Sequence, residues 1–236
     1  MTGALALCRK EFNAYFYSAV AYVFIVSFLV VTYWFFFRGF FLNNQIQMRD
    51  YFFFLPWVFL VFIPAVTMRL WAEEKKMGTV EILLTMPVRE YELVLGKFMA
   101  GFLFVFVSVF FSFSLPLTLS FFGELDWGPV IGGYLGTCLL GGAYLSVGLF
   151  LSNFTKNQIV AFILTILLSF VFFILGEDII LANLPDFWVP LFSFVGLGKH
   201  FISLQRGMID SRDIIYYLSV TGFFLFLNIL YVARRR

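Results

Sequence analysis

The sequence predicts an all-α, polytopic integral membrane protein with six transmembrane helices. Its 236 residues are 62% hydrophobic and only 13% charged, whereas average soluble domains carry about 25% charged residues. Apolar stretches long enough to cross roughly 30 Å of hydrocarbon recur along the chain. A chain that crosses lipid must satisfy its backbone hydrogen bonds internally, so we expect these stretches to be helices.

Six apolar stretches come close to the roughly 20 residues that a membrane span needs. They cover residues 17–37, 52–71, 98–122, 130–152, 158–175 and 214–233. The fifth stretch is short and could extend past Gly176. We expect kinks in the second and third spans at Pro56, Pro64 and Pro116. No internal repeat or linker divides the sequence, which predicts a single transmembrane domain over residues 1–236.

The positive charges predict the orientation, because cytoplasmic loops carry an excess of Lys and Arg. With both termini in the cytoplasm, only five of the 16 Lys and Arg residues lie outside, namely Arg38, Arg49, Lys199, Arg206 and Arg212. The three arginines at positions 234–236 strengthen this assignment. Loops 72–97 and 153–157 are then cytoplasmic, and the external loops are 38–51, 123–129 and 176–213.

Two segments outside the spans have compositions that suit the membrane surface. Residues 4–17 mix charged and apolar side chains, which suits either an interfacial helix or a simple positive anchor, and the pattern favours neither. Loop 176–213 is too long for a bare turn and contains Trp188, Phe192 and Phe194. Because aromatic residues favour the interface, we expect this loop to return to the membrane surface.

The composition of the spans excludes several classes of function. Apart from Arg69 near the end of the second span, they lack the ionisable residues that mark ion sites and proton relays, which argues against an ion-coupled transporter and an intramembrane enzyme. The sequence has no phosphate-binding GxxxxGK[ST] motif, so this chain is not expected to bind ATP or to be catalytic. A single histidine argues against a metal site, and a net charge of +2 is too small to suggest nucleic acid.

The polar and glycine residues within the spans leave alternatives open. Ser112, Thr165 and Ser169 could line a substrate path, although hydrogen bonds between helices are the favoured interpretation. Several glycines in the fourth span predict close helix packing, either within the chain or across a dimer. These are Gly132, Gly133, Gly136, Gly141, Gly142 and Gly148.

A charged stretch at residues 69–97 separates the second and third apolar segments. Glu73–Lys76 ends the second span, Gly78 is expected to break its helix, and Thr79 can cap a new one. Pro87 then stops the new helix, because proline cannot continue it. Its apolar side consists of Val80, Leu83 and Leu84. This pattern predicts either a rigid docking knob or a plain solvated connector.

The same stretch, EEKKMGTVEILLTMPVREYELVLGK, resembles the first cytoplasmic loop of type-2 ABC transporter permeases. The matching residues are Glu74, Lys75, Gly78, Thr79, Glu81, Leu83, Leu84, Pro87, Val88, Leu95, Gly96 and Lys97. The amino-terminal KEFNAYFYSAVAYVF is similar to the interfacial helix and first span of that family. Within the family, the resemblance is to the branch of gliding-motility and nitrous-oxide-reductase maturation permeases.

The resemblance implies a coupling helix over residues 78–86, between the second and third spans. Glu81, Leu83 and Leu84 would form its docking face, and Glu74 and Lys75 would add charged contacts. The partners it implies are two copies of a P-loop ATPase, which bind ATP and Mg, and a second permease chain, identical or related. Membrane lipid surrounds the chain, and an accessory or periplasmic subunit could join. The chain itself would bind no cofactor.

These implications place the chain in a bacterial cytoplasmic (inner) membrane as the permease subunit of an ATP-driven exporter or mechanotransmitter. Two alternatives remain at this stage. One is a structural or scaffolding membrane subunit, and the other is a channel without ATP coupling. Neither alternative needs the motif around Gly78, which is the sequence feature that separates them from the transporter.

Overall fold

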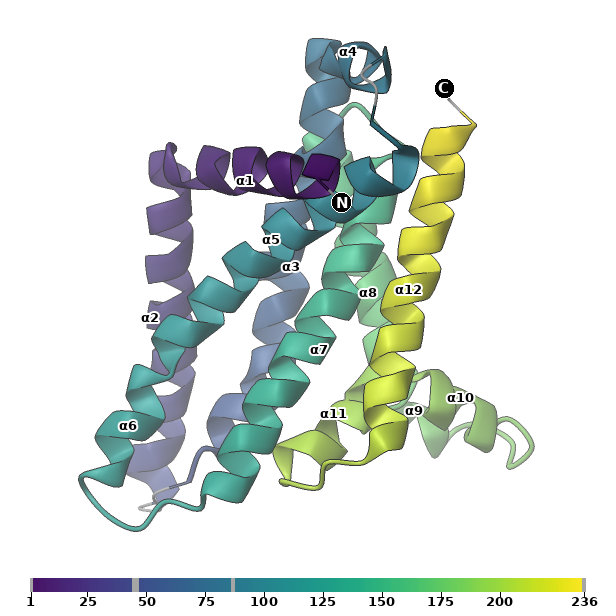
Figure 1. Cartoon of the computed structure of the whole chain (residues 1–236). Coiled ribbons are helices and arrows are strands. Elements are labelled where there is room, and N and C mark those ends of the chain that lie inside the picture. Colours follow the sequence, from purple (N-terminus) through teal and green to yellow (C-terminus); the bar gives the residue numbers. More distant parts are fainter. Residues whose placement is uncertain (1, 44–46, 86–87, 235–236) are drawn as a thin grey trace.

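The computed structural model describes residues 2–43, 47–85 and 88–234, without the side chains of residues 2, 41–43, 82 and 84. The regular secondary structure of this described part is entirely helical (Figure 1). Five of its helices are long and apolar enough to cross a membrane. The structure therefore confirms the predicted class, an all-α membrane protein.

The five long helical segments agree with five of the predicted spans. They are α2 (Ala19–Asn43), α3 (Arg49–Met77), α5 (Glu90–Ser112) continued by α6 (Ser114–Ser120), α7 (Trp127–Ser152) and α12 (Ser211–Ala233). The predicted fifth span corresponds to α8 (Gln158–Ile174), an apolar helix of 17 residues. At 1.5 Å per residue it is about 26 Å long, a little shorter than the hydrocarbon layer. The sixth crossing stays a prediction.

The prolines act differently in the two spans that contain them. Pro56 and Pro64 lie inside α3, which continues through both as one helix. The third span is instead divided at Phe113, between α5 and α6. Pro116 lacks an N–H, and its ring crowds the carbonyl of Ser112 four residues earlier, so the regular helix ends there.

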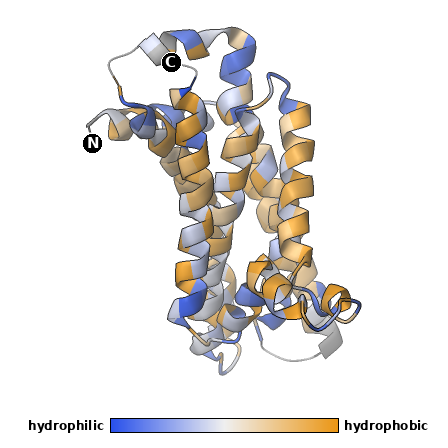
Figure 2. Cartoon of the chain, turned by 90° about the vertical axis from the view of Figure 1, so that its right-hand side faces the viewer, coloured by the Kyte–Doolittle hydropathy of each residue, from blue (hydrophilic) through white to orange (hydrophobic). Residues whose placement is uncertain are grey.

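The helices form a bundle with two distinct ends (Figure 1). At one end α1 (Thr2–Phe16) runs crosswise to α2, and the short helix α4 (Thr79–Thr85) and both chain termini lie at this same end. We call it the α4 end, and we call the other the α11 end. Hydrophobic residues fill the middle of the bundle, and hydrophilic residues gather toward the two ends (Figure 2). The crosswise α1 is the arrangement expected of an interfacial helix.

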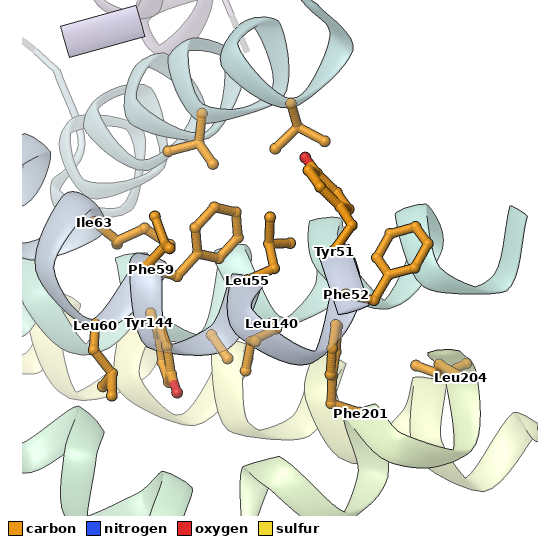
Figure 3. Close-up of a cluster of buried hydrophobic side chains, with 14 of the residues drawn as sticks. Tyr51, Phe52, Leu55, Phe59, Leu60, Ile63, Leu140, Tyr144, Phe201 and Leu204 are labelled. Atoms are coloured by element: carbon orange, nitrogen blue, oxygen red, sulfur yellow. The ribbon is translucent and has the colours of Figure 1, made fainter. Parts of the chain in front are cut away.

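Helix α7 is the centre of the bundle because its glycines let neighbouring helices approach. A methyl group at Gly133 would lie 2.5 Å from the ring of Phe52 in α3, and Gly148 meets Thr67 of α3 just as closely. Figure 3 shows this core, with Leu140 and Tyr144 of α7 placed among side chains of α3. For these glycines the predicted close packing is therefore within the chain.

The segment after α8 folds back against the bundle at the α11 end. It forms α9 (Asp178–Leu181), α10 (Val189–Val195) and α11 (Leu197–Gln205), and α11 packs on α7. Tyr217 of α12 donates a hydrogen bond of 2.7 Å to the carbonyl of Leu197. His200 pairs with Asp213 at 2.7 Å and stacks on Tyr216. The long predicted loop is thus a helical cap fixed to α12.

Candidate functional site

The candidate site is the elbow between α3 and α4, where the sequence predicts a helix break. Gly78 has φ +73°, a left-handed conformation that glycine adopts without a steric penalty. Its N–H donates to the carbonyl of Glu74, and the Thr79 hydroxyl donates to the same oxygen at 3.3 Å. The predicted break is confirmed. Thr79 is the first residue of α4, and its described side-chain bond reaches back to α3.

Behind the elbow, Lys97 joins three helices in a buried ion cluster. Its side chain is fully buried, and its Nζ lies 2.7 Å from Glu74 of α3 and 3.0 Å from Glu11 of α1. It also donates to the carbonyl of Leu70 at 2.9 Å and lies 5.0 Å from the centre of the Trp71 ring. We call Lys97, Glu11 and Glu74 the Lys97 cluster.

Ion pairs of this kind are strong constraints on geometry. Removing one partner of a buried pair costs about 3–5 kcal/mol, because the remaining charge is left without compensation. The one cation comes from α5 and the two carboxylates from α1 and α3, so none of these three helices can move away alone without that penalty. The Lys97 cluster therefore holds the end of α3 to α1 and to the start of α5.

On the other side of α3, Lys75 connects the elbow to two further helices. Its side chain is buried, and its Nζ donates to the carbonyl of Asn153, the residue that ends α7. The Asn153 amide donates in turn to Asn228 of α12 at 2.9 Å. Lys75 also lies 5.3 Å from the centre of the Tyr231 ring in α12. We call Lys75, Asn153 and Asn228 the Lys75 cluster.

A cavity opens beside the elbow between α1, α3 and α4, with a volume of about 360 Å³. Its wall carries Lys10 and Glu11 of α1 and Arg69 and Glu73 of α3. Arg69 pairs with Glu73 at 3.6 Å and lies over the ring of Tyr15, 5.0 Å from its centre. These partly exposed charges form a polar margin around the elbow.

The structure places the predicted docking residues in two groups. Glu81 is exposed on α4, whereas Glu74 and Lys75 point inward and belong to the two clusters. Leu83 is only 5% exposed and packs with Leu70 and other residues of the core. The side chain of Leu84 and all of Pro87 lie outside the described residues.

Glu74, Lys75 and Leu83 make internal contacts of the elbow. Their predicted roles in coupling to an ATPase stay predictions. The physical reason for the internal contacts is that the boundary of an apolar bundle is a poor place for an unpaired charge, so Glu74 and Lys75 take partners within the chain. Leu83 faces the carboxyl-terminal part of α3, because the side of α4 that carries Leu83 is apolar.

The structure buries the three predicted substrate-path residues inside the bundle, Ser112 on α5 and the other two on α8. Ser112, Thr165 and Ser169 are all fully buried, and none of them lines a described cavity. Ser112 accepts a hydrogen bond of 2.7 Å from Tyr51, and Thr165 donates to a carbonyl of its own helix. The bond to Ser112 joins α3 and α5, as the favoured interpretation predicts, whereas the bond from Thr165 stays within α8.

Within the described part of the chain, no group of three or more His, Cys, Asp or Glu side chains could hold a metal ion. The one histidine, His200, is engaged with Asp213 and with the carbonyl of Phe194 at 3.0 Å. Burial raises the pKa of the Cys8 thiol on α1, which makes this cysteine a poor nucleophile. The chemistry of the site is thus that of buried ion pairs and packing.

Sequence reasoning missed the partners that complete the two clusters, Glu11, Lys97, Asn153 and Asn228. One signal could have found them. Each is a charged or amide side chain next to or inside an apolar stretch, where a polar group needs a partner from another helix. The sequence does not say which helix supplies that partner.

The fold and the elbow together define a multi-pass helical membrane protein with one short helix projecting from one end of its bundle. A family model described as ABC-2 family transporter protein matches residues 50–230. This range is well over half of the chain, so the protein belongs to the ABC-2 transporter family. It is thus a permease-type membrane protein of a family that works with an ABC ATPase. No curated protein matches the chain.

Proposed function

We propose that this chain is the membrane-spanning permease subunit of an ATP-driven exporter or mechanotransmitter. In this proposal α4 is the coupling helix, it lies on the cytoplasmic side, and it docks on a separate ATPase subunit. ATP and Mg bind to that ATPase, and this chain has no catalytic residue of its own.

The observation that supports this function best is the way in which α4 is attached. A connector would need only a flexible turn, but here the end of α3 is held by buried charges on both sides. The Lys97 cluster joins it to α1 and α5, and the Lys75 cluster joins it to α7 and α12. A displacement of α4 would therefore reach five helices at once.

Such an attachment suits the transmission of a rigid-body movement. When ATP closes an ATPase dimer, the push on α4 would tilt α3, because Leu83 and the bonds at Glu74 hold α4 to its end. Helix α8 would follow α3, since Thr67 and Thr165 meet at Gly148 where α3, α7 and α8 pack closely. The coupled motion of α3 and α8 would switch the permease between inward-facing and outward-facing states.

The expected assembly contains two ATPase subunits and a second permease chain, either a copy of this one or a related chain. Exposed apolar side chains on α2, including Tyr22, Val26, Val30 and Trp34, suit contact with lipid or with that second chain. We place the assembly in the cytoplasmic membrane of a bacterium. Within the family we propose the gliding-motility and nitrous-oxide-reductase maturation branch, on the sequence motif around Gly78.

The first experiment purifies the whole chain in mild detergent and identifies the proteins that accompany it. Glu81→Arg reverses an exposed charge on α4 and should lower the amount of co-purified ATPase about tenfold, a loss of roughly 1.4 kcal/mol. Glu124→Arg makes the same change at an exposed residue of the α11 end and should leave the ATPase unchanged.

The two alternatives give a different result. A scaffold or a channel without ATP coupling would be recovered without a stoichiometric ATPase. If an ATPase is recovered but Glu81→Arg and Glu124→Arg retain it equally, α4 is not the docking element. An ATPase activity that changes with the Glu81 variant alone would support the transporter.

A further inference from the structure

A second, mostly apolar cavity lies on the outer side of α12 at the α11 end. It has a volume of about 510 Å³ and is bounded by α12, by Phe172 of α8 and by Phe194 and Val195 of α10. We call it the α12 groove. Figure 2 views the molecule from the side of α12, α9 and α10, and hydrophobic residues predominate in the middle of the bundle.

The walls of the α12 groove are built from aromatic side chains. Phe194 packs edge-on against Tyr216 with 5.6 Å between ring centres, and Phe172 packs edge-on against Phe224 at 5.9 Å. Between these two contacts the groove is open, and Phe194 and Phe223 keep about 60% of their surface exposed. In water such a surface would be unfavourable, so in the membrane it needs an apolar occupant.

One end of the α12 groove differs from the rest. Arg212 lies at the start of α12 and is the one charged residue among those that line the groove in the described chain. It is exposed, and no ion pair joins it to any other described residue. The neighbouring carboxylate of Asp213 is already engaged by His200. Arg212 thus offers its guanidinium group to a ligand.

The length of the α12 groove matches one leaflet of a bilayer. From Arg212 to Phe224 the helix advances about 18 Å at 1.5 Å per residue, and half of the hydrocarbon layer is about 15 Å thick. A cation at the end of the spanning helix and an apolar channel below it correspond to the headgroup and an acyl chain. Guanidinium groups bind phosphate oxygens with two parallel hydrogen bonds.

We propose that the α12 groove holds a resident phospholipid from the leaflet at the α11 end. Its phosphate pairs with Arg212, and one acyl chain lies along Val220 and Phe223 between α12 and α8. The lipid fills the space between α10 and α12 and so fastens the helical cap to the bundle. This site does not depend on the proposed ATPase coupling, because it lies at the opposite end of the molecule.

The test reconstitutes the whole chain in nanodiscs that contain phosphatidylglycerol with a photoreactive diazirine in the middle of one acyl chain. After illumination, mass spectrometry maps the labelled residues. We expect Phe172 and Phe224, inside the groove, to be labelled more than Leu218 and Phe226 on the exposed face of α12. Equal labelling on both faces would mean ordinary surrounding lipid and would overturn the proposal.

Matched variants test the two halves of the site. Arg212→Gln should lower groove labelling about tenfold, as loss of one charge-assisted contact would. Arg206 is an exposed arginine at the same end but outside the α12 groove, so Arg206→Gln should leave groove labelling unchanged. Ser219→Trp should fill the groove and abolish labelling, whereas Gly222→Trp, where nothing lies within 4 Å of the added carbon, should not.

Three other results would contradict the assignment. Labelling that survives both Arg212→Gln and Ser219→Trp would place the lipid elsewhere. Labelling lost equally in Arg206→Gln would indicate a general effect of positive charge at this end of the molecule. A groove that stays unlabelled while Leu218 and Phe226 are labelled would mean that something other than lipid, such as a second permease chain, fills it.

Discussion

At the scale of single residues, the position of Lys97 decides how the elbow is held. A lysine at the boundary of an apolar bundle would ordinarily extend its amine toward water. Here the side chain is fully buried, because Glu11, Glu74 and the Leu70 carbonyl supply three oxygen partners within 3.0 Å. The cost of removing the ion from water is offset only if all of these contacts are kept.

We therefore expect Lys97→Met to destabilise the protein by about 3–5 kcal/mol, since two carboxylates are left without a cation. For a chain of this size the shift in Tm is on the order of 10 °C. Thermal unfolding of the two proteins in detergent measures this shift in Tm. Lys76→Met removes an exposed lysine of α3, the helix that carries Glu74, and should shift the Tm by less than about 2 °C.

A second comparison checks the electrostatic cause. Adding Glu11→Gln and Glu74→Gln to Lys97→Met removes the uncompensated charges, so part of the lost stability should return. If Lys97→Met and Lys76→Met unfold at the same temperature, the Lys97 cluster does not hold the elbow.

At the scale of elements, α7 shows why glycine is used inside a spanning helix. Glycine costs about 1 kcal/mol relative to alanine in an ordinary helix, so its repeated use needs a packing reason. In α7 that reason is the approach of α3 and α11, whose Phe52 and Leu204 occupy the space of the missing side chains. A different glycine, Gly222 in α12, has no atom within 4 Å of the position that a methyl group would take.

These two environments predict opposite effects of the same substitution. Gly133→Ala should destabilise the protein by about 1–3 kcal/mol, because the new methyl group would lie 2.5 Å from the ring of Phe52. Gly222→Ala should be neutral or stabilise it by up to about 1 kcal/mol. The Tm values of the two variants, measured in the same detergent, test this difference in stability. Equal values would contradict the packing argument.

At the scale of the whole molecule, the two ends carry different structural features. The α4 end carries the elbow, both termini and the two lysine clusters, whereas the α11 end carries the helical cap and the α12 groove. The distribution of Lys and Arg predicts that the α4 end faces the cytoplasm. An assembly driven by ATP requires this same orientation, because its ATPase must meet α4.

Cysteine labelling in intact cells measures the orientation. Both native cysteines are first replaced by alanine; Cys8 is buried and its pKa is raised, so it contributes little thiolate at neutral pH in any case. A membrane-impermeant maleimide should then label Glu124→Cys in intact cells, and Lys76→Cys only after the cells are opened. The reverse pattern would overturn both the orientation and the docking of an ATPase at α4.

The local pattern of the sequence determined a large part of this architecture. Apolar length predicted the long helices, and the break at Gly78 followed from the need for a left-handed residue at the end of α3. The mixed composition of the amino-terminal segment allowed an interfacial helix without favouring it over a simple positive anchor. These features depend on interactions between residues close together in the chain, which a sequence records directly.

Only the tertiary structure decided where the polar side chains point. Glu74, Lys75 and Leu83 have the composition of an exposed knob, yet they turn inward because α1, α5, α7 and α12 end beside them. Likewise, the glycines of α7 predicted close packing but not its partner, and Arg212 looked like a simple loop charge. The identity of a contact across the bundle depends on which helices become neighbours, and residue spacing along one helix does not contain that information.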